Sequence, residues 1–202
     1  MKLFGTTTSP YTRKIRILLR AAGVEATFVD TRTDEGAGAL MRLAPVGKVP
    51  VVELEGTEAG EGGTRVLPDS GLIAAWLWTH HRPAIVAAGF SIAPDDWDDR
   101  ARLVVVEGAL DAAINRFYLL RDELPDQGYV TRQRDRVATS LAAIDAALPP
   151  FARPLTASAL SLGCGLDWMI FRNVVDLAPY PRVRGFHEAW TASGVGAGTE
   201  PG

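Results

Sequence analysis

The sequence predicts a protein of two parts, an α/β region followed by an all-helical region. The first 80 or so residues alternate short apolar segments of strand type with amphipathic segments of helical type. After residue 94 the strand-type segments stop, and apolar residues recur at helical spacing. We therefore expect an α/β domain over residues 1–80, a linker over 81–94 and an all-α helical bundle over 95–202.

The first region begins with a strand, a helix and a second strand. Residues 2–5 and 26–30 have strand character, and the helical segment between them ends at Gly23. The apolar stripe of this helix consists of Tyr11, Ile15, Leu18, Leu19 and Ala22. A strand–helix–strand unit of this kind predicts two parallel strands.

Four further elements complete the first region. A short helix is predicted through residues 40–44, and strands are predicted at 50–54 and 65–67. Residues 55–63 contain only Gly, Glu, Thr and Ala, which indicates a mobile hairpin loop between these strands. A last helix starts at Asp69, so the predicted order of elements is βαβαββα.

Four helices are predicted in the second region, and most carry recognisable start or stop signals. Asp95 and Asp96 can cap the first helix, Pro149 ends the second, and Thr156 can cap the third. The approximate ranges are 95–124, 130–148, 156–172 and 181–190. Residues 194–202 follow the last helix, and we expect them to form a flexible tail.

Composition restricts the classes of function. The chain has 202 residues, of which 47% are hydrophobic and 22% charged, so it can build an ordinary globular core. A formal net charge of −3 gives no reason to expect a nucleic-acid partner. The single cysteine, Cys164, excludes an internal disulfide framework and a cysteine-rich metal site. No apolar segment has the length of a signal peptide or membrane span, so we expect a cytoplasmic protein without a membrane partner or a metal.

The turn between the first strand and the first helix could hold an anion. Residues 6–12 lie where backbone N–H groups at a helix start are unpaired and carry partial positive charge, which favours a thiolate. Ser9 followed by Pro10 also fits a plain helix cap with proline in the first turn. The two interpretations are compatible, because a capping hydroxyl can turn its hydrogen toward a ligand.

Two other segments are candidates that say little when taken singly. Pro50 stands at the start of a strand, where proline is tolerated. If the Val49–Pro50 bond were cis, the backbone of Val49 would be turned out beside the helix end that bears Ser9. Asp69 and Ser70 open a helix, and aspartate is a routine cap at such a position.

These three segments in this order, followed by a helical region, resemble the glutathione transferase family. The likeness is closest to bacterial cytosolic members that begin with Ser-Pro-Phe/Tyr-x-x-Arg-Lys, for which residues 9–14 of this chain read Ser-Pro-Tyr-Thr-Arg-Lys, with one residue fewer before the arginine. It extends over nearly the whole chain, including residues 171–174 and 199–201. The chain departs from the family at Ala159, where the capping box that begins at Thr156 commonly has an acid.

The resemblance implies a thioredoxin-like N-terminal domain with a cis Pro50 and a glutathione site along its edge. By position, the backbone of Val49 would pair with the cysteinyl part of glutathione. Asp69 and Ser70 would hold the γ-glutamyl ammonium and carboxylate groups, and Lys48 could reach the glycyl carboxylate.

The resemblance also implies a mechanism in which glutathione is the co-substrate. Ser9 would donate its hydroxyl hydrogen to the glutathione sulfur, and Thr8 and Tyr11 are alternative donors. The thiolate would then attack a small, apolar electrophile, and the family implies a homodimer. Two other interpretations remain open: a non-catalytic module with this fold that binds a partner or ligand, and a glutathione-dependent isomerase or reductase. A reductase is disfavoured because serine stands where a nucleophilic cysteine would be required.

Overall fold

The structure is a computed structural model that describes residues 1–56 and 63–202. Residues 1–93 together with 198–202 form one compact unit, called unit 1, and residues 94–197 form a second, called unit 2. Most of the hairpin loop that we predict at residues 55–63 lies outside the described residues. Among the described residues, no helix is long and apolar enough to cross a membrane.

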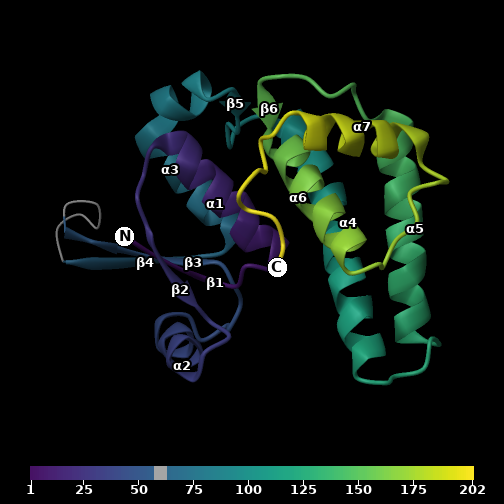
Figure 1. The fold of residues 1–202 in the computed structure, drawn as a ribbon, viewed down its shortest axis with the longest axis horizontal. Coiled ribbons are helices and arrows are strands. Elements are labelled where there is room, and N and C mark those ends of the chain that lie inside the picture. Colours follow the sequence, from purple (N-terminus) through teal and green to yellow (C-terminus); the bar gives the residue numbers. More distant parts are fainter. Residues whose placement is uncertain (57–62) are drawn as a thin grey trace. The chain divides into compact units, whose positions relative to one another are not determined.

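Unit 1 contains a mixed four-stranded sheet in the order β2-β1-β3-β4 (Figure 1). The strands are β1 (Lys2–Gly5), β2 (Thr27–Asp30), β3 (Val51–Glu55) and β4 (Thr64–Pro68). As predicted, β1 and β2 are parallel and helix α1 (Pro10–Ala22) connects them. Strand β3 is antiparallel to both of its neighbours, β1 and β4.

The register of these strands places three connecting segments at one edge of the sheet. Phe4 of β1 lies opposite Val51 of β3, and Val51 lies opposite Pro68 of β4. Strands β1 and β4 therefore run in the same direction and end at the same level. Three connecting segments consequently meet at the end of the sheet where β1 ends: the turn after Gly5, the segment before Val51 and the turn after Pro68. We call this end of the sheet the β1 edge.

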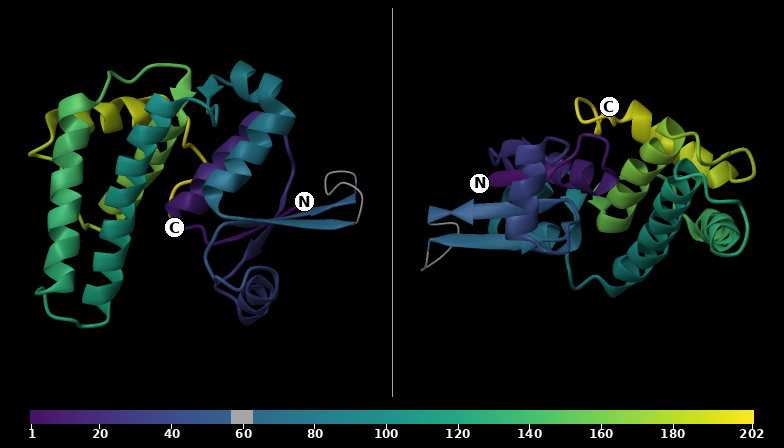
Figure 2. Two further views of the ribbon diagram at one scale, coloured as in Figure 1. Left: turned by 180° about the vertical axis from the view of Figure 1, so that it is seen from behind. Right: turned by 90° about the horizontal axis from the view of Figure 1, so that it is seen from below.

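Helices cover both faces of the sheet. Helices α1 and α3 (Ser70–Ala87) lie on one face and pack against each other, while α2 (Asp34–Leu43) lies on the opposite face (Figures 1 and 2). Each of α1 and α3 follows a strand that ends at the β1 edge and then returns across the sheet. The N-termini of both helices are therefore at the β1 edge.

A small apolar cluster joins α2 to the sheet. Phe4 and Val51 pack against Leu40 and Ala44, and all four side chains are buried. The helix is longer than the predicted segment 40–44, because it begins six residues earlier. Its first turns contain glycines and few apolar residues, so the apolar pattern marks only the end that faces the core.

Helix α3 continues to Ala87, beyond residue 80 where we expect the first domain to end. His81 has non-helical backbone angles, with φ −128° and ψ 20°, and Pro83 follows two residues later. A proline inside a helix lacks a donor and collides with the carbonyl four residues before it, so the chain bends here. The strand β5 (Phe90–Ser91) follows, and the segment 81–94 that we expect to be a linker is thus partly regular.

Unit 2 is the predicted helical region. Its helices are α4 (Trp97–Arg121), α5 (Tyr129–Ala147), α6 (Ala157–Phe171) and α7 (Pro181–Ala192), and a short strand β6 (Leu155–Thr156) precedes α6. Helix α4 contacts α5 and α6, and α7 contacts the same two helices. Leu110, Leu141, Leu166 and Trp190 are almost completely buried in this unit.

Helix α6 receives caps from two parts of the chain. The Thr156 hydroxyl accepts a hydrogen bond from the Ala159 N–H at 3.3 Å, as predicted. Asp99, on α4 and only 2% exposed, accepts a second bond from the Ser158 N–H at 3.2 Å and another from the Ser158 hydroxyl. A carboxylate thus lies at the start of α6 even though residue 159 is alanine.

The last residues of the chain are not the free tail that we expect. Residues 198–202 belong to unit 1, where Arg13 Nε donates to the Thr199 hydroxyl at 3.1 Å. Arg16 donates to the Gly198 carbonyl at 3.3 Å. Arg13 is only 3% exposed. Arg13 therefore lies against the C-terminal residues rather than on a solvated face of α1.

Candidate functional site

Ser9 occupies the start of α1 at the β1 edge. Its backbone is extended, with φ −72° and ψ 123°, and its hydroxyl accepts a hydrogen bond from the Thr12 N–H at 3.2 Å. Pro10 is the first helical residue, where its missing N–H costs nothing. Both parts of the predicted cap are confirmed. Among the described residues the Ser9 hydroxyl hydrogen has no acceptor, so it can donate to a ligand.

The turn before Ser9 is held by its own hydrogen bonds. The Ser9 N–H donates to the Thr6 carbonyl at 3.2 Å, and the hydroxyls of Thr6 and Thr8 are hydrogen-bonded to each other at 3.2 Å. The Thr8 hydroxyl therefore already has a partner within the turn. Either hydroxyl can be the donor in this bond, so Thr8 stays an alternative to Ser9 as the donor to a ligand at the helix end.

Tyr11, the other alternative donor, lies in the first turn of α1 and is partly buried. The ammonium group of Lys14 lies 5.8 Å from the centre of its ring. A cation at this distance from an aromatic face is attracted by the ring. The geometry gives Tyr11 a contact along its own helix.

The segment before β3 also lies at the β1 edge. The Val49–Pro50 peptide bond is cis, as the family resemblance implies. The side chain of Val49 packs against the apolar cluster under α2, and Pro50 is buried. Lys48 is exposed and, among the described residues, forms no hydrogen bond or ion pair. Its ammonium group is thus available to an anion.

Asp69 combines a helix cap with an unusual backbone conformation. Its carboxylate accepts hydrogen bonds from the Gly71 N–H at 2.7 Å and the Leu72 N–H at 3.2 Å. Its φ is +81° and its ψ is 134°, a region that side chains with a Cβ rarely occupy. Such a conformation costs about 1–3 kcal/mol and is found mainly at ligand-binding and catalytic positions. The sequence predicts the cap but carries no sign of this strain.

Ser70 is the first residue of α3 and is 4% exposed. Together with Asp69 it places a hydroxyl, a carboxylate and the helix N-terminus at one point. The carboxylate can pair with an ammonium group, and the helix end favours an anion.

The register of the sheet brings the predicted site residues to one place. Ser9 follows β1 through a short turn, Pro50 directly precedes β3, and Asp69 directly follows β4. The β1 edge therefore offers two positive helix ends, one carboxylate and a stretch of backbone. Such a combination suits a small zwitterionic peptide with an ionisable group, such as a thiol.

Lys2 forms two charge pairs at the other end of the sheet. Lys2 Nζ donates to Glu53 at 2.9 Å and to Glu55 at 2.7 Å. The bonds to Glu55 and Glu53 raise the pKa of Lys2, and the bond from Lys2 lowers the pKa of Glu55. These charges neutralise each other and do not compete for a ligand at the β1 edge.

Metal chemistry has no evident site in the described part of the chain, where no group of three or more His, Cys, Asp or Glu side chains could hold a metal ion. Cys164, on α6, is 1% exposed and packed in the core of unit 2. It is buried as expected for an inert thiol.

Comparison with known proteins finds a likeness to glutathione S-transferases. Residues 3–84 match the family model described as the glutathione S-transferase N-terminal domain, a range that includes Ser9, Pro50 and Asp69. A curated relative, the uncharacterized GST-like protein YibF of Escherichia coli (strain K12), is 24% identical over 183 residues. The match covers 86% of this chain and 84% of that protein.

Two solved structures extend the likeness to the whole chain. A glutathione S-transferase from Methylobacillus flagellatus KT, with glutathione bound, has a TM-score of 0.81 at 23% identity and covers 100% of this chain and 99% of its own. A maleyl pyruvate isomerase, a bacterial glutathione S-transferase of the Zeta class, has a TM-score of 0.74 at 20% identity and covers 100% and 97%. The predicted fold, a thioredoxin-like domain followed by a helical domain, is confirmed.

Proposed function

We propose that this chain is a glutathione transferase of the bacterial cytosolic type that begins with a Ser-Pro-Phe/Tyr-x-x-Arg-Lys segment, represented here by residues 9–14, and that it binds glutathione at the β1 edge. The observation that carries the proposal is the meeting of Ser9, Val49–Pro50 and Asp69 at one end of the sheet beside two helix N-termini. Support comes from the match of residues 3–84 to the family model and from the bound glutathione in a structural neighbour.

Each group of glutathione has a complementary partner. The γ-glutamyl ammonium pairs with the Asp69 carboxylate, and the γ-glutamyl carboxylate binds Ser70 and the N-terminus of α3. The cysteinyl part pairs with the backbone of Val49. Lys48, which is exposed and unpaired among the described residues, binds the glycyl carboxylate. These contacts place the sulfur near the start of α1.

Ser9 then favours the ionised form of the thiol. A thiol with a pKa of about 8.5 is mostly protonated at neutral pH, and only the thiolate is a good nucleophile. A hydrogen bond from the Ser9 hydroxyl and the positive end of α1 both stabilise the thiolate, so they lower the pKa of the bound thiol. The thiol proton leaves to solvent.

The thiolate next attacks a small, apolar electrophile. A sulfur–carbon bond forms, and the leaving group departs with its electron pair or, with an activated alkene, a carbon takes up a proton. Neither a protein cysteine nor a metal takes part in this step. Detoxification of such electrophiles, assembly as a homodimer and a cytoplasmic location belong to the same proposal. So do a glutathione-binding domain over residues 1–80, joined by the segment 81–94 to a helical domain over 95–202.

A glutathione-dependent isomerase is the second candidate. The structural likeness to a maleyl pyruvate isomerase supports it, and an isomerase needs the same activated thiol. The difference lies in the acceptor. In an isomerase the thiolate adds to a double bond of the substrate, and glutathione is released unchanged after the bond has isomerised. A reductase is less suitable because Ser9 cannot form the mixed disulfide that a nucleophilic cysteine would form.

Calorimetry with glutathione and turnover of a generic aryl halide test the proposal together. We expect heat of association and measurable turnover, and we expect Ser9→Ala to lower kcat by about 10- to 100-fold while glutathione still binds. Thr8→Val is the comparison variant, since a larger loss there would move the role to Thr8. Binding without turnover of any electrophile would identify a non-catalytic module, and no binding would reject the site.

A further inference from the structure

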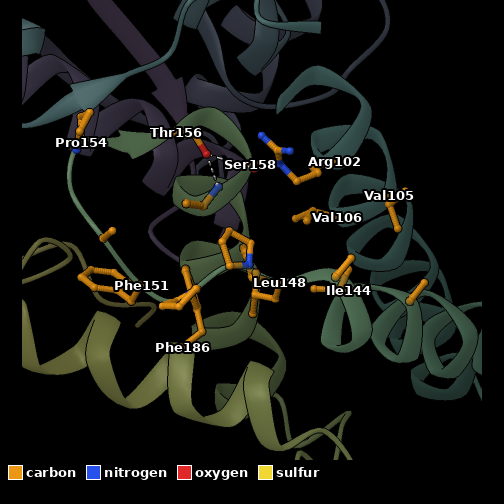
Figure 3. A pocket seen from close by; sticks show the side chains of 17 residues that line it. Arg102, Val105, Val106, Ile144, Leu148, Phe151, Pro154, Thr156, Ser158 and Phe186 are labelled. Carbon is orange, nitrogen blue, oxygen red and sulfur yellow. Dashed lines mark hydrogen bonds between the residues drawn. The ribbon is translucent and has the colours of Figure 1, made fainter. Parts of the chain in front are cut away.

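Unit 2 contains an apolar cavity of about 260 Å³ (Figure 3). Its walls come from α4, α5, α6, α7 and the loop between α5 and β6. The deeper lining consists of Val106, Ile144, Leu148, Phe151, Leu162 and Phe186. None of the residues that we place in the glutathione site belongs to it.

The cavity exists because small residues and prolines leave space between the helices. Ala143 and Ala147 of α5 and Ala159 of α6 stand where larger side chains would fill it. Pro149, Pro150 and Pro154 hold the loop along its rim, and their φ angles are fixed by the ring. A cavity with such a rim is shaped before a ligand arrives, which lowers the entropic cost of binding.

One positive charge stands at the polar end of this cavity. Arg102 of α4 lines it beside Thr156 and Ser158 (Figure 3), and its side chain is 46% exposed. Among the described residues its guanidinium group forms no hydrogen bond, and its one ion-pair contact is with Asp99 at 3.8 Å.

Asp99 does not use the hydrogen-bond donors of the Arg102 guanidinium group. Its carboxylate oxygens accept hydrogen bonds from the N–H and the hydroxyl of Ser158, which fix it at the start of α6. At 3.8 Å the Arg102 nitrogen is beyond hydrogen-bond distance of that carboxylate. The guanidinium group therefore keeps its N–H donors for a second carboxylate, to which it can bind in a bidentate manner.

We infer that this cavity binds a small monocarboxylate with an unbranched apolar tail. The carboxylate pairs with Arg102, and the tail lies among Val106, Ile144 and Leu162. An apolar cavity of about 150 Å³ admits benzene, so about 260 Å³ suits a tail of about eight to ten carbon atoms. Water is a poor occupant because an apolar wall gives it few hydrogen-bond partners.

Titration of the full-length protein with octanoate, followed by calorimetry and by NMR of the methyl groups, tests this inference. We expect saturable binding with shifts at Val105, Val106, Ile144 and Leu162. Affinity should rise about fourfold for each methylene from hexanoate to octanoate, because each methylene is removed from water. Octan-1-ol should bind about tenfold more weakly than octanoate, since it cannot form the charged pair. Equal affinity for the acid and the alcohol would overturn the role of Arg102.

Three variants locate the binding. Arg102→Gln should reduce octanoate affinity to the level of octan-1-ol, whereas Arg100→Gln, an exposed arginine on the same helix outside the cavity, should leave it unchanged. Ala147→Phe changes an exposed rim position and should abolish binding by filling the space. Octanoate binding that survives Ala147→Phe, or methyl shifts elsewhere, would contradict the inference. Because glutathione affinity is measured on the same samples, a failure here is distinguishable from a failure of the proposed function.

Discussion

Asp69 shows how one residue can serve both the fold and the ligand. Its carboxylate caps α3 through Gly71 and Leu72, while its backbone has a φ of +81°. A routine cap has extended backbone angles and needs no such strain. We interpret the conformation as the means by which the carboxylate also faces the β1 edge.

Asp69→Asn separates these two roles. Asparagine can still accept from the helix N–H groups and tolerates a positive φ, so the free energy of unfolding should change by less than about 1 kcal/mol. The loss of charge should weaken glutathione binding by a factor of about 10 to 100, because the pair with the γ-glutamyl ammonium is lost. Urea denaturation and calorimetry measure the two quantities. Unchanged glutathione affinity would remove Asp69 from the site.

For single residues, the sequence predicts helix-capping roles better than it predicts burial or backbone conformation. Ser9 with Pro10 and Asp69 have short-range capping signals that the sequence carries. The burial of Arg13 does not follow from its neighbours in the sequence, because Thr199 supplies the partner from the other end of the chain. The positive φ of Asp69 is likewise set by the connection from β4 to α3.

At the scale of the elements, α6 and α7 of unit 2 approach closely because Gly163 has no side chain. A Cβ on Gly163 would lie 2.4 Å from the Trp190 ring, and that ring is fixed by a hydrogen bond from its N–H to Asp167 at 2.8 Å. The ring cannot move aside without breaking this bond. A small residue at 163 is therefore a condition for the packing of these helices.

Gly163→Ala should destabilise the protein by about 1–3 kcal/mol, since the added methyl group forces the two helices apart. Gly165→Ala is the matched control on the same helix, where the nearest atom to a new Cβ is Leu110 Cδ2 at 3.5 Å. That change should be neutral or stabilising by up to about 1 kcal/mol through helix propensity. Urea denaturation measures both variants, and equal effects would refute the close packing.

The start of α6 depends on a carboxylate from α4. Asp99→Ala leaves the Ser158 N–H buried without its acceptor and removes one of the two partners of the Ser158 hydroxyl, which should cost about 2–4 kcal/mol. Asp98→Ala, at the exposed neighbouring position, should cost less than about 1 kcal/mol. Thermal or urea unfolding of the two variants checks this, and similar losses would show that Asp99 is an ordinary first-turn acid.

Elements with regular apolar spacing were predictable, and elements with local exceptions were not. Strand β1 and helix α7 fall close to the predicted ranges because their patterns are short and clear. Helix α3 continues past Pro83 because the chain bends at His81, which relieves the steric clash of the proline ring with the preceding turn. The rule that proline ends helices does not predict such a bend. Its extension was therefore missed.

For the whole molecule, the order of elements was enough to predict the fold class. A βαβ unit followed by a hairpin and a helical region restricts the topology strongly, and the match of residues 3–84 to the family model agrees with it. Two features depend on contacts between residues distant in the sequence and could not be predicted from it. These are the return of residues 198–202 to unit 1 and the apolar cavity of unit 2.

The candidate site is likewise a property of the assembled sheet. No single segment supplies it, because Ser9, Pro50 and Asp69 meet only through the pairing of β1, β3 and β4. The sequence supplied the three segments and the family resemblance supplied their relation.

The pKa of the glutathione thiol in the complex tests the central claim most directly. It can be followed through the ultraviolet absorbance of the thiolate as the pH is raised, in the wild type and in Ser9→Ala. We predict a pKa of about 6.5–7.5 for the bound thiol, against about 8.5 for an ordinary free thiol, and a higher value in Ser9→Ala. A bound thiol that titrates like free glutathione, with no difference between the two proteins, would contradict the account.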